Sequence, residues 1–295
     1  MSESSTDLAT IGLLGLGTTG AGIAQLLAAS GRKVVAVETD RARLDAGLAA
    51  VAAFLDGGVS RGTVTEADKH AVLDRVTGTT SVTELRGVDA VLECVTENAE
   101  VKTTLLSEVA ATVGDRIPLL TTTSTLSVTD LAAGLPEPGR VAGLHFFDPA
   151  PIMHTVEIVR ALQTEADLID RLVALVDTLD VEVAVVVDDR PGFLINALLL
   201  PYLNDVVAEY DEGLATAEDI DTALELGLGY RTGPLKLLDS IGLDVHLHAT
   251  EAAYTATGDP RYAPPPLLRR MVAAGWLGSE TGHGFRTAPH REDNN

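Results

Sequence analysis

A glycine-rich turn near the start of the chain has the residue types and the spacing that bind a dinucleotide. It lies between an expected strand at residues 10–14 and a helical pattern that follows. In such a turn the first glycine allows a tight bend, the second lets the backbone approach a pyrophosphate, and the third lets the helix pack on the strand. The N-terminus of the helix adds backbone N–H groups and a positive dipole. The residues predicted to hold a cofactor here are Gly15, Gly17, Thr18, Thr19 and Gly20.

Glu38 extends this prediction to the sugar of the cofactor. It lies 18 residues after Gly20, at the end of the expected strand 33–37. A carboxylate at this place accepts hydrogen bonds from the ribose hydroxyls of the adenosine half and repels a 2′-phosphate. The sequence therefore favours NAD over NADP. An empty structural turn is the alternative, because glycine patterns of this kind also occur by chance.

A histidine and a glutamate further along the chain have the chemistry of an acid–base pair. His145 ends the expected strand 141–145, and Glu157 follows 12 residues later. A histidine at the carboxyl edge of such a sheet lies where ligands bind, and its imidazole transfers protons near neutral pH. A carboxylate on a nearby strand would hold the second ring nitrogen and stabilise the imidazolium. The spacing alone does not show that the two side chains meet, and a structural histidine is the alternative.

The elements that must position these residues alternate between strands and helices up to about residue 188, and are helical beyond it. This order predicts an α/β fold, a Rossmann-type doubly wound sheet domain followed by an all-helical C-terminal domain. The expected domains are an NAD-binding sheet domain at residues 1–188 and a helical domain at residues 189–295. Expected strands cover residues 10–14, 33–37, 90–95, 118–122, 141–145 and 183–187. Expected helices include a pair between 41 and 76, broken near 57–58 and 62, and later 193–210, 217–226, 235–254 and 266–274.

The charge and the cysteine content exclude several other classes of protein. The chain has 295 residues, of which 21 are basic and 43 acidic, so its formal net charge is −22. This charge argues against nucleic acid or an anionic membrane as the main partner. The single cysteine, Cys94, excludes an intramolecular disulfide and a multi-cysteine metal site, and we expect it to be buried packing. His246 and His248 have no third ligand in their helical pattern, so no metal site is predicted.

The N-terminal residues and the hydropathy pattern indicate where the protein works. The first seven residues carry acids where a signal peptide needs positive charge, and no apolar run approaches the length of a membrane span. We therefore expect a cytoplasmic protein that does not cross a membrane.

Several motifs occur in an order that covers nearly the whole chain. They include GLGTTGAGIAQ from Gly15, ECVTENAEVK at 93–102, TSTLSVTDLA at 123–132, HFFDPAPIMHTVE at 145–157 and RPGFLINALLLPYLN at 190–204. Together they resemble the L-3-hydroxyacyl-CoA dehydrogenase family, especially its short-chain 3-hydroxybutyryl-CoA branch. The resemblance implies an NAD-dependent oxidoreductase of fatty acid metabolism that interconverts a short (S)-3-hydroxyacyl-CoA and its 3-oxo form. It also implies a homodimer formed through the C-terminal helices.

The resemblance assigns roles to individual residues. His145 would take the proton of the substrate 3-hydroxyl as its hydride passes to the nicotinamide, and Glu157 would orient His145. Ser124 matches the family serine that hydrogen-bonds the reacting oxygen. Asn196 matches an asparagine near the substrate carbonyl, which an amide donor can polarise.

Three further residues match family positions that contact the cofactor or the substrate. Glu97 and Lys102 match a pair that contacts the cofactor ribose and orders its site; a solvated acid–base pair at a helix start is the alternative. Arg61 matches a base that contacts CoA, and a solvated loop base is the alternative.

The chain also departs from the family pattern, which puts the surroundings of the substrate in doubt. The family commonly has asparagine where this chain has Thr122 and Asp148, and other residues where it has Thr63, Ala197 and Glu280. Fewer basic residues at the CoA entrance leave open the same chemistry on a hydroxyacyl group carried by an acyl carrier protein in specialised metabolism. An enzyme that acts on a free sugar acid is a weaker hypothesis, because the His-Phe-Phe segment that begins at His145 resembles the acyl-CoA branch. A non-catalytic NAD-binding structural or sensing protein is the alternative from another class.

Overall fold

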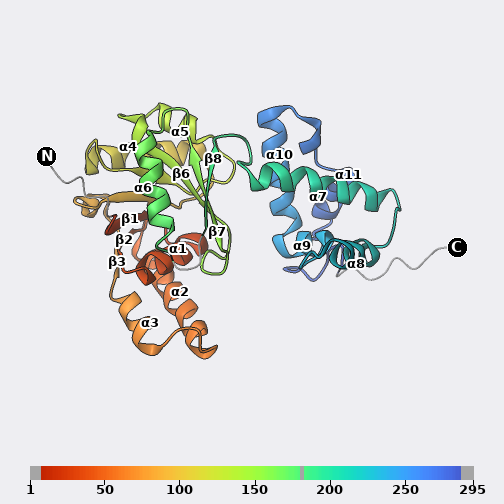
Figure 1. Ribbon diagram of the computed structural model, residues 1–295, viewed down its shortest axis with the longest axis horizontal. Helices are drawn as coiled ribbons and strands as arrows, with labels where there is room; N and C mark the ends of the chain where they lie inside the picture. Colours follow the sequence, from red (N-terminus) through yellow and green to blue (C-terminus); the bar gives the residue numbers. More distant parts are fainter. Residues whose placement is uncertain (1–7, 180–182, 287–295) are drawn as a thin grey trace. The chain divides into compact units, whose positions relative to one another are not determined.

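The computed structural model describes residues 8–179 and 183–286, which form two compact units (Figure 1). The first unit extends to Phe193 and the second begins at Leu194. The boundary expected from the sequence, at residue 188, lies slightly earlier, at the last residue of a strand.

The described part of the first unit contains an eight-stranded sheet. The strands are β1 (Thr10–Leu14), β2 (Lys33–Val37), β3 (Val76–Thr79), β4 (Ala90–Glu93), β5 (Leu119–Thr121), β6 (Val141–Phe146), β7 (Thr155–Arg160) and β8 (Val183–Asp188). Their order in the sheet is β3-β2-β1-β4-β5-β6-β7-β8, and β6 and β7 pair antiparallel whereas the other neighbours are parallel. The chain changes direction across the sheet between β1 and β4, the switch point where doubly wound sheets bind ligands.

Helices cover both faces of this sheet (Figure 1). They are α1 (Thr18–Ala29), α2 (Arg41–Ser60), α3 (Glu66–Leu73), α4 (Ala99–Val113), α5 (Val128–Ala133) and α6 (Ala166–Val176), with short 3-10 helices at Val82–Leu85 and Pro138–Arg140. Ile23 of α1 and Leu172 of α6 belong to the apolar cluster on one face. Leu106 of α4 and Leu131 of α5 belong to the cluster on the other. Burial on both faces explains why the strands are continuous apolar runs in the sequence.

Two local predictions in this unit were wrong. Of the two breaks expected in this helical region, the one at 57–58 is absent, because α2 continues to Ser60, whereas the turn at Gly62 is present and its φ of +73° suits glycine. Residues 76–79 form β3, a strand that was not expected; only Val76 lay within the expected helical region. Their β-branched residues pair with β2, so tertiary pairing decides their conformation.

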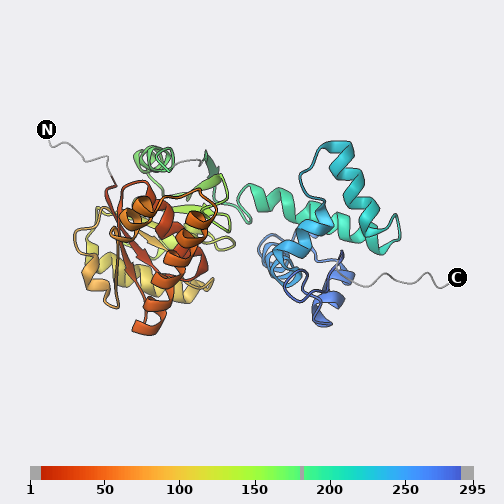
Figure 2. The ribbon, with the colours of Figure 1, turned by 90° about the horizontal axis from the view of Figure 1, so that it is seen from below.

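The described part of the second unit is helical (Figure 2). It contains α7 (Ile195–Asp211), α8 (Ala217–Leu228), α9 (Pro234–Ile241), α10 (Leu243–Thr257) and α11 (Pro266–Ala273), with a 3-10 turn at Pro260–Tyr262. Leu203, Leu235, Leu243 and Leu268 share its apolar core. The single helix expected over 235–254 is two helices, because Gly242 adopts a φ of +101° and ends α9.

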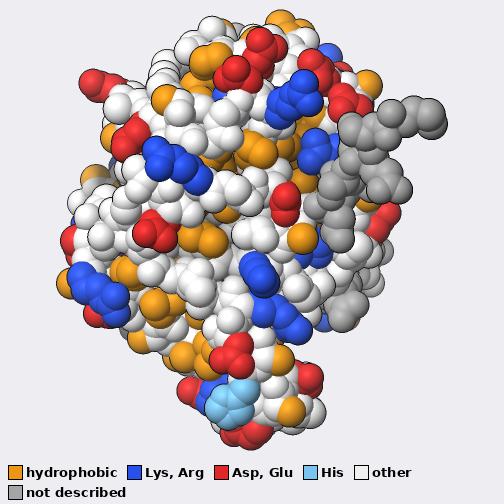
Figure 3. Space-filling view, turned by 90° about the vertical axis from the view of Figure 1, so that its left-hand side faces the viewer, with side chains coloured by type: hydrophobic (Ala, Val, Ile, Leu, Met, Phe, Trp, Pro, Cys, Tyr) orange, Lys and Arg blue, Asp and Glu red, His pale blue; other side chains and the backbone are white. Residues whose placement is uncertain are grey.

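The face of the molecule in Figure 3 carries basic and acidic side chains interspersed with apolar ones. On this face the basic side chains do not gather into one large patch. Among the described residues, none of the helices is both long and apolar enough to cross a membrane.

Candidate active site

His145 and Glu157 meet across the antiparallel strands β6 and β7. The two residues lie directly opposite each other in the register of this pair, so their side chains point to the same face of the sheet. Nδ1 of His145 lies 2.7 Å from Oε2 of Glu157, and both side chains are almost fully buried. A carboxylate in this position accepts the Nδ1 proton and leaves Nε2 as the nitrogen that exchanges protons.

Ser124 lies on the other side of the imidazole. Its hydroxyl oxygen is 3.1 Å from Nε2 of His145. The rings of Phe147 and Phe193 contact the imidazole with their edges, at centroid distances of 4.7 and 5.4 Å. These contacts fix the plane of the ring, so Nε2 and the Ser124 hydroxyl converge on the same point.

Glu97 holds the segment that carries Ser124. Its Oε1 accepts hydrogen bonds from the backbone N–H groups of Ser124 and Thr125 and from the hydroxyls of Thr123 and Thr125, at 2.6 to 3.0 Å. Burial alone would raise the pKa of the Glu97 carboxyl. The hydrogen bonds and the charge of Lys102 outweigh burial and hold this pKa below its ordinary value.

Lys102 occupies the interior rather than the surface. Its ammonium group donates to Oε1 of Glu93 at 2.7 Å and to the carbonyl oxygen of Val95, and it lies 3.4 Å from Oε2 of Glu97. Only 1% of the side chain is exposed. Of the predicted pair, Lys102 therefore orders the loop after β4, whereas Glu97 is the partly exposed member.

The glycine turn after β1 fits the pyrophosphate of a dinucleotide. A Cβ on Gly20 would lie 2.2 Å from the carbonyl oxygen of Gly15, so the start of α1 packs against the turn. Gly15 has a φ of +89°. A Cβ on Gly17, in contrast, would meet no atom within 4 Å, which leaves open space where a phosphate must approach the backbone. Thr18 and Thr19 form the first turn of α1, beside this space.

Glu38 lies at the carboxyl end of β2, next to the same turn. Its Oε1 accepts a hydrogen bond of 2.7 Å from the backbone N–H of Leu16. The carboxylate is thereby fixed beside the turn, in the place expected for the adenosine ribose of NAD.

The structure gives no contact between the two remaining predicted residues, Arg61 and Asn196, and the residues described above. Arg61 caps the C-terminus of α2 and is exposed. Asn196 lies in the first turn of α7, in the second unit, and is half-buried.

Two acidic residues at the site were missed from the sequence. Glu93 ends β4 fully buried, and accepts from Lys102, from the backbone of Val95 and from the hydroxyl of Thr121. An acid at the end of an apolar strand was the available signal. Asp148, noted only as a departure from the family, accepts a hydrogen bond of 2.8 Å from the hydroxyl of Thr19.

The sequence predicted that Cys94 is buried packing and that His246 forms no metal site with His248. Cys94 is half-buried, and burial raises the pKa of its thiol. His246 is buried in α10 and its Nε2 lies 3.0 Å from Oδ1 of Asn204. Within residues 8–179 and 183–286, no group of three or more His, Cys, Asp or Glu side chains is placed to hold a metal ion.

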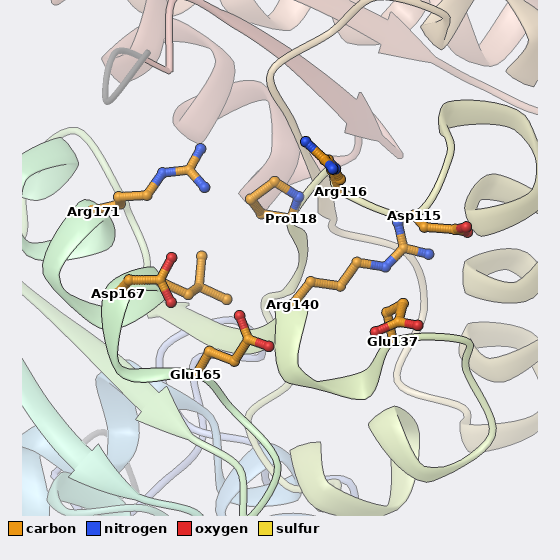
Figure 4. A pocket seen from close by; sticks show the side chains of 9 residues that line it. Asp115, Arg116, Pro118, Glu137, Arg140, Glu165, Asp167 and Arg171 are labelled. Carbon is orange, nitrogen blue, oxygen red and sulfur yellow. The ribbon is translucent and has the colours of Figure 1, made fainter. Parts of the chain in front are cut away.

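A separate hollow lies beside the amino ends of β5 and β6, the edge of the sheet opposite His145 (Figure 4). Its volume is about 220 Å³. Three arginines and four carboxylates line it, among them Arg140 and Asp167. Because these charges nearly balance, the hollow has no strong preference for an anion.

Comparison with known proteins identifies the family. Residues 10–190 match the NAD binding domain of 3-hydroxyacyl-CoA dehydrogenase, and residues 192–288 match its C-terminal domain. The chain belongs to the 3-hydroxyacyl-CoA dehydrogenase family. This membership confirms the predicted fold class, the NAD cofactor and the class of enzyme, an NAD-dependent oxidoreductase.

Individual relatives belong to the branch that the sequence motifs resemble. A 3-hydroxybutyryl-CoA dehydrogenase of Mycobacterium tuberculosis is 38% identical over 278 residues, which are 94% of this chain and 97% of the relative. A probable 3-hydroxybutyryl-CoA dehydrogenase of Bacillus subtilis is 36% identical, covering 95% and 97%. The solved structure of (S)-3-hydroxybutyryl-CoA dehydrogenase from Ralstonia eutropha is 40% identical, with a TM-score of 0.90 over 95% of this chain and 98% of that one. These relatives favour neither the carrier-protein alternative nor the non-catalytic one.

Proposed function

We propose that the chain interconverts a short (S)-3-hydroxyacyl-CoA and the corresponding 3-oxoacyl-CoA in the cytoplasm. The observation that carries this proposal is the buried His145, held between Glu157 and Ser124 at the carboxyl edge of an NAD-binding sheet. The names of the relatives support the short acyl chain.

In the oxidative direction Nε2 of His145 accepts the proton of the 3-hydroxyl. The hydroxyl of Ser124, 3.1 Å from Nε2, hydrogen-bonds the same oxygen and keeps it in line with the imidazole. Glu157 stabilises the imidazolium that forms, because its carboxylate is bonded to Nδ1. When bound, NAD+ would supply the acceptor for the hydride that leaves C3. In the reductive direction His145 returns the proton to the carbonyl oxygen.

The remaining predicted residues complete the site in this proposal. Gly15, Gly17, Gly20 and the first turn of α1 bind the pyrophosphate, and Glu38 binds the adenosine ribose. Asn196 supplies an amide donor to the substrate carbonyl, and Arg61 contacts a phosphate of CoA. Residues 1–188 act as the cofactor domain and 189–295 as the domain that closes over the substrate.

The first test is the variant His145→Ala. Loss of the proton acceptor should lower turnover by about 10²- to 10⁴-fold, whereas the Kd for NAD should change less than about threefold, because the pyrophosphate and ribose contacts remain. The absorbance of NADH follows turnover, and calorimetry follows NAD binding. Turnover like that of the wild type in a folded variant would reject the role of His145.

A substrate panel tests the proposed specificity. Short 3-hydroxyacyl groups are offered on CoA and on an acyl carrier protein, with NAD and with NADP. We expect the highest kcat/KM for the CoA thioester with NAD. Preference for the carrier protein would replace the proposed substrate, and preference for NADP would contradict the role given to Glu38.

We also propose that the protein is a homodimer formed through its helical unit. Leu198, Leu226 and Leu228 expose more than 60% of their surfaces there, which is costly for large apolar side chains in water. Light scattering should give twice the chain mass of 30.8 kDa. A monomer at micromolar concentration would contradict this proposal.

A further inference from the structure

We propose that Asp148 makes the cofactor site discriminate between the two redox forms, by weakening the binding of NADH relative to NAD+. This inference rests on the proposed dehydrogenase function. Resemblance to the family leads one to expect a neutral asparagine at this position, so the negative charge is a property of this chain.

The hydrogen bond from Thr19 places Asp148 at the cofactor site. Thr19 is the second residue of α1 and lies between Gly17 and Gly20 of the glycine turn. Asp148 follows β6 closely, three residues after His145. The bond of 2.8 Å between Thr19 Oγ1 and Asp148 Oδ2 therefore brings a carboxylate between the turn that binds the pyrophosphate and the strand that carries the imidazole.

The strand order assigns Asp148 to the nicotinamide half of the site. Glu38 lies at the end of β2, on one side of β1, where it marks the adenosine half. A dinucleotide crosses the sheet at the switch point, so its other half lies over β4, β5 and β6. Asp148 follows β6, on this second side.

The charge of the nicotinamide determines the sign of the effect. The ring is positively charged in NAD+ and neutral in NADH. A carboxylate near the ring attracts the positively charged ring of NAD+ but not the neutral ring of NADH. It repels the pyrophosphate of both forms equally. Lys102 is shared by two carboxylates, Glu93 at 2.7 Å and Glu97 at 3.4 Å, so it has no excess positive charge with which to neutralise Asp148.

The expected size of the effect is moderate because Asp148 is exposed and partly screened. Two charges about 6 Å apart, in a medium of effective dielectric near 40, give roughly a tenfold preference. For a two-electron couple, tenfold corresponds to about 30 mV in the potential of the bound cofactor. The bound equilibrium thus shifts toward NAD+ and hydroxyacyl thioester, the products of reduction.

The variant Asp148→Asn tests this inference. It removes the charge but keeps a side-chain oxygen that can accept the Thr19 hydroxyl. The Kd for NADH is measured by its fluorescence and the Kd for NAD+ by calorimetry. We expect the ratio of the Kd for NADH to that for NAD+ to fall about tenfold, and the difference between variant and wild type to shrink as salt is added.

The control is Asp115→Asn, which removes the same charge from an exposed residue that precedes β5, at the opposite edge of the sheet. It should leave the ratio unchanged. Asp148→Ser provides a second neutral variant if the asparagine variant does not fold.

Two results would overturn the inference. One is a Kd ratio in the variant within twofold of the wild-type ratio. The other is an equal decrease in the Kd values for NADH and NAD+, which would mean that the charge acts on the pyrophosphate alone. Failure of the proposed function is distinguishable. In that case hydroxyacyl thioesters would not be turned over, whereas the two Kd values could still be measured and compared.

Discussion

Lys102 brings an ammonium group into the interior of the first unit. Burying a charge is costly unless it is paired and hydrogen-bonded. Here Glu93 supplies the pairing carboxylate, and the carbonyl of Val95 supplies a further acceptor. The Glu93 carboxylate is itself satisfied by Thr121 and by the backbone of Val95. The pair therefore stabilises the loop that leads to Glu97, which in turn holds Ser124.

The variant Lys102→Met should destabilise the protein. Removing one partner of a buried ion pair leaves the other uncompensated, at a cost of about 3–5 kcal/mol in the free energy of unfolding. Denaturant unfolding measures this loss. The double variant Glu93→Gln with Lys102→Met should recover part of it, since no buried charge is then left alone at this pair. A loss below about 1 kcal/mol in the single variant would contradict this account.

The residues of the site could be predicted from the sequence to different extents. The three glycines and Glu38 have a spacing tied to a known function, so the cofactor site followed from residue types and positions. Glu93 was missed because its partner, Lys102, comes from the next helix, and a single acid at the end of an apolar strand is by itself a weak signal. The role of Lys102 as a buried group was missed for the same reason.

At the scale of elements, β6 and β7 make the acid–base pair possible. A parallel crossover would have carried Glu157 to a distant strand, whereas the antiparallel return places it opposite His145. The eight residues between the two strands are too few for a parallel crossover, but residues 155–160 were not expected to be a strand, so this reversal was not predicted. Tertiary pairing likewise decided β3, which begins at the last residue of the expected helical region and was not expected from the sequence.

The packing of α10 on α7 depends on a neutral histidine. His246 bonds Asn204, whose amide donates to Thr250, and burial lowers the pKa of His246 to about 4. In the unfolded chain the pKa of histidine is about 6.5. The unfolded state therefore binds a proton first as pH falls. The stability contributed by neutral His246 is present above about pH 6.5 and is lost as pH falls toward 4.

This contribution can be isolated with His246→Gln. From pH 7.5 to pH 5 the wild type should lose about 2 kcal/mol more unfolding free energy than the variant, since glutamine does not titrate. Denaturant unfolding at both pH values gives the difference. Parallel pH dependence in the two proteins would show that His246 is not kept neutral by its surroundings.

At the scale of the whole molecule, the net charge of −22 opposes the approach of an anionic substrate. CoA carries several phosphate charges, and their repulsion from the protein extends over the Debye length. This length falls from about 30 Å at 0.01 M salt to about 8 Å at 0.15 M. Local basic residues such as Arg61 must act against this field.

We therefore expect kcat/KM for the acyl-CoA substrate to rise severalfold as salt increases over this range. The matched control is the same acyl group on pantetheine, which lacks the phosphates and should respond less than about twofold. Steady-state kinetics at fixed NAD measures both. A fall in kcat/KM with salt would mean that attraction by basic residues at the entrance outweighs the overall charge.

The antiparallel pairing of β6 and β7, with His145 opposite Glu157, also restricts where residues can be inserted or deleted in this chain. One residue inserted between Thr155 and Glu157 would turn the carboxylate to the reverse side of the sheet, because successive side chains in a strand alternate. Insertions and deletions that descendants of this sequence tolerate should therefore fall in the connection between the two strands, where added residues leave the pairing unchanged.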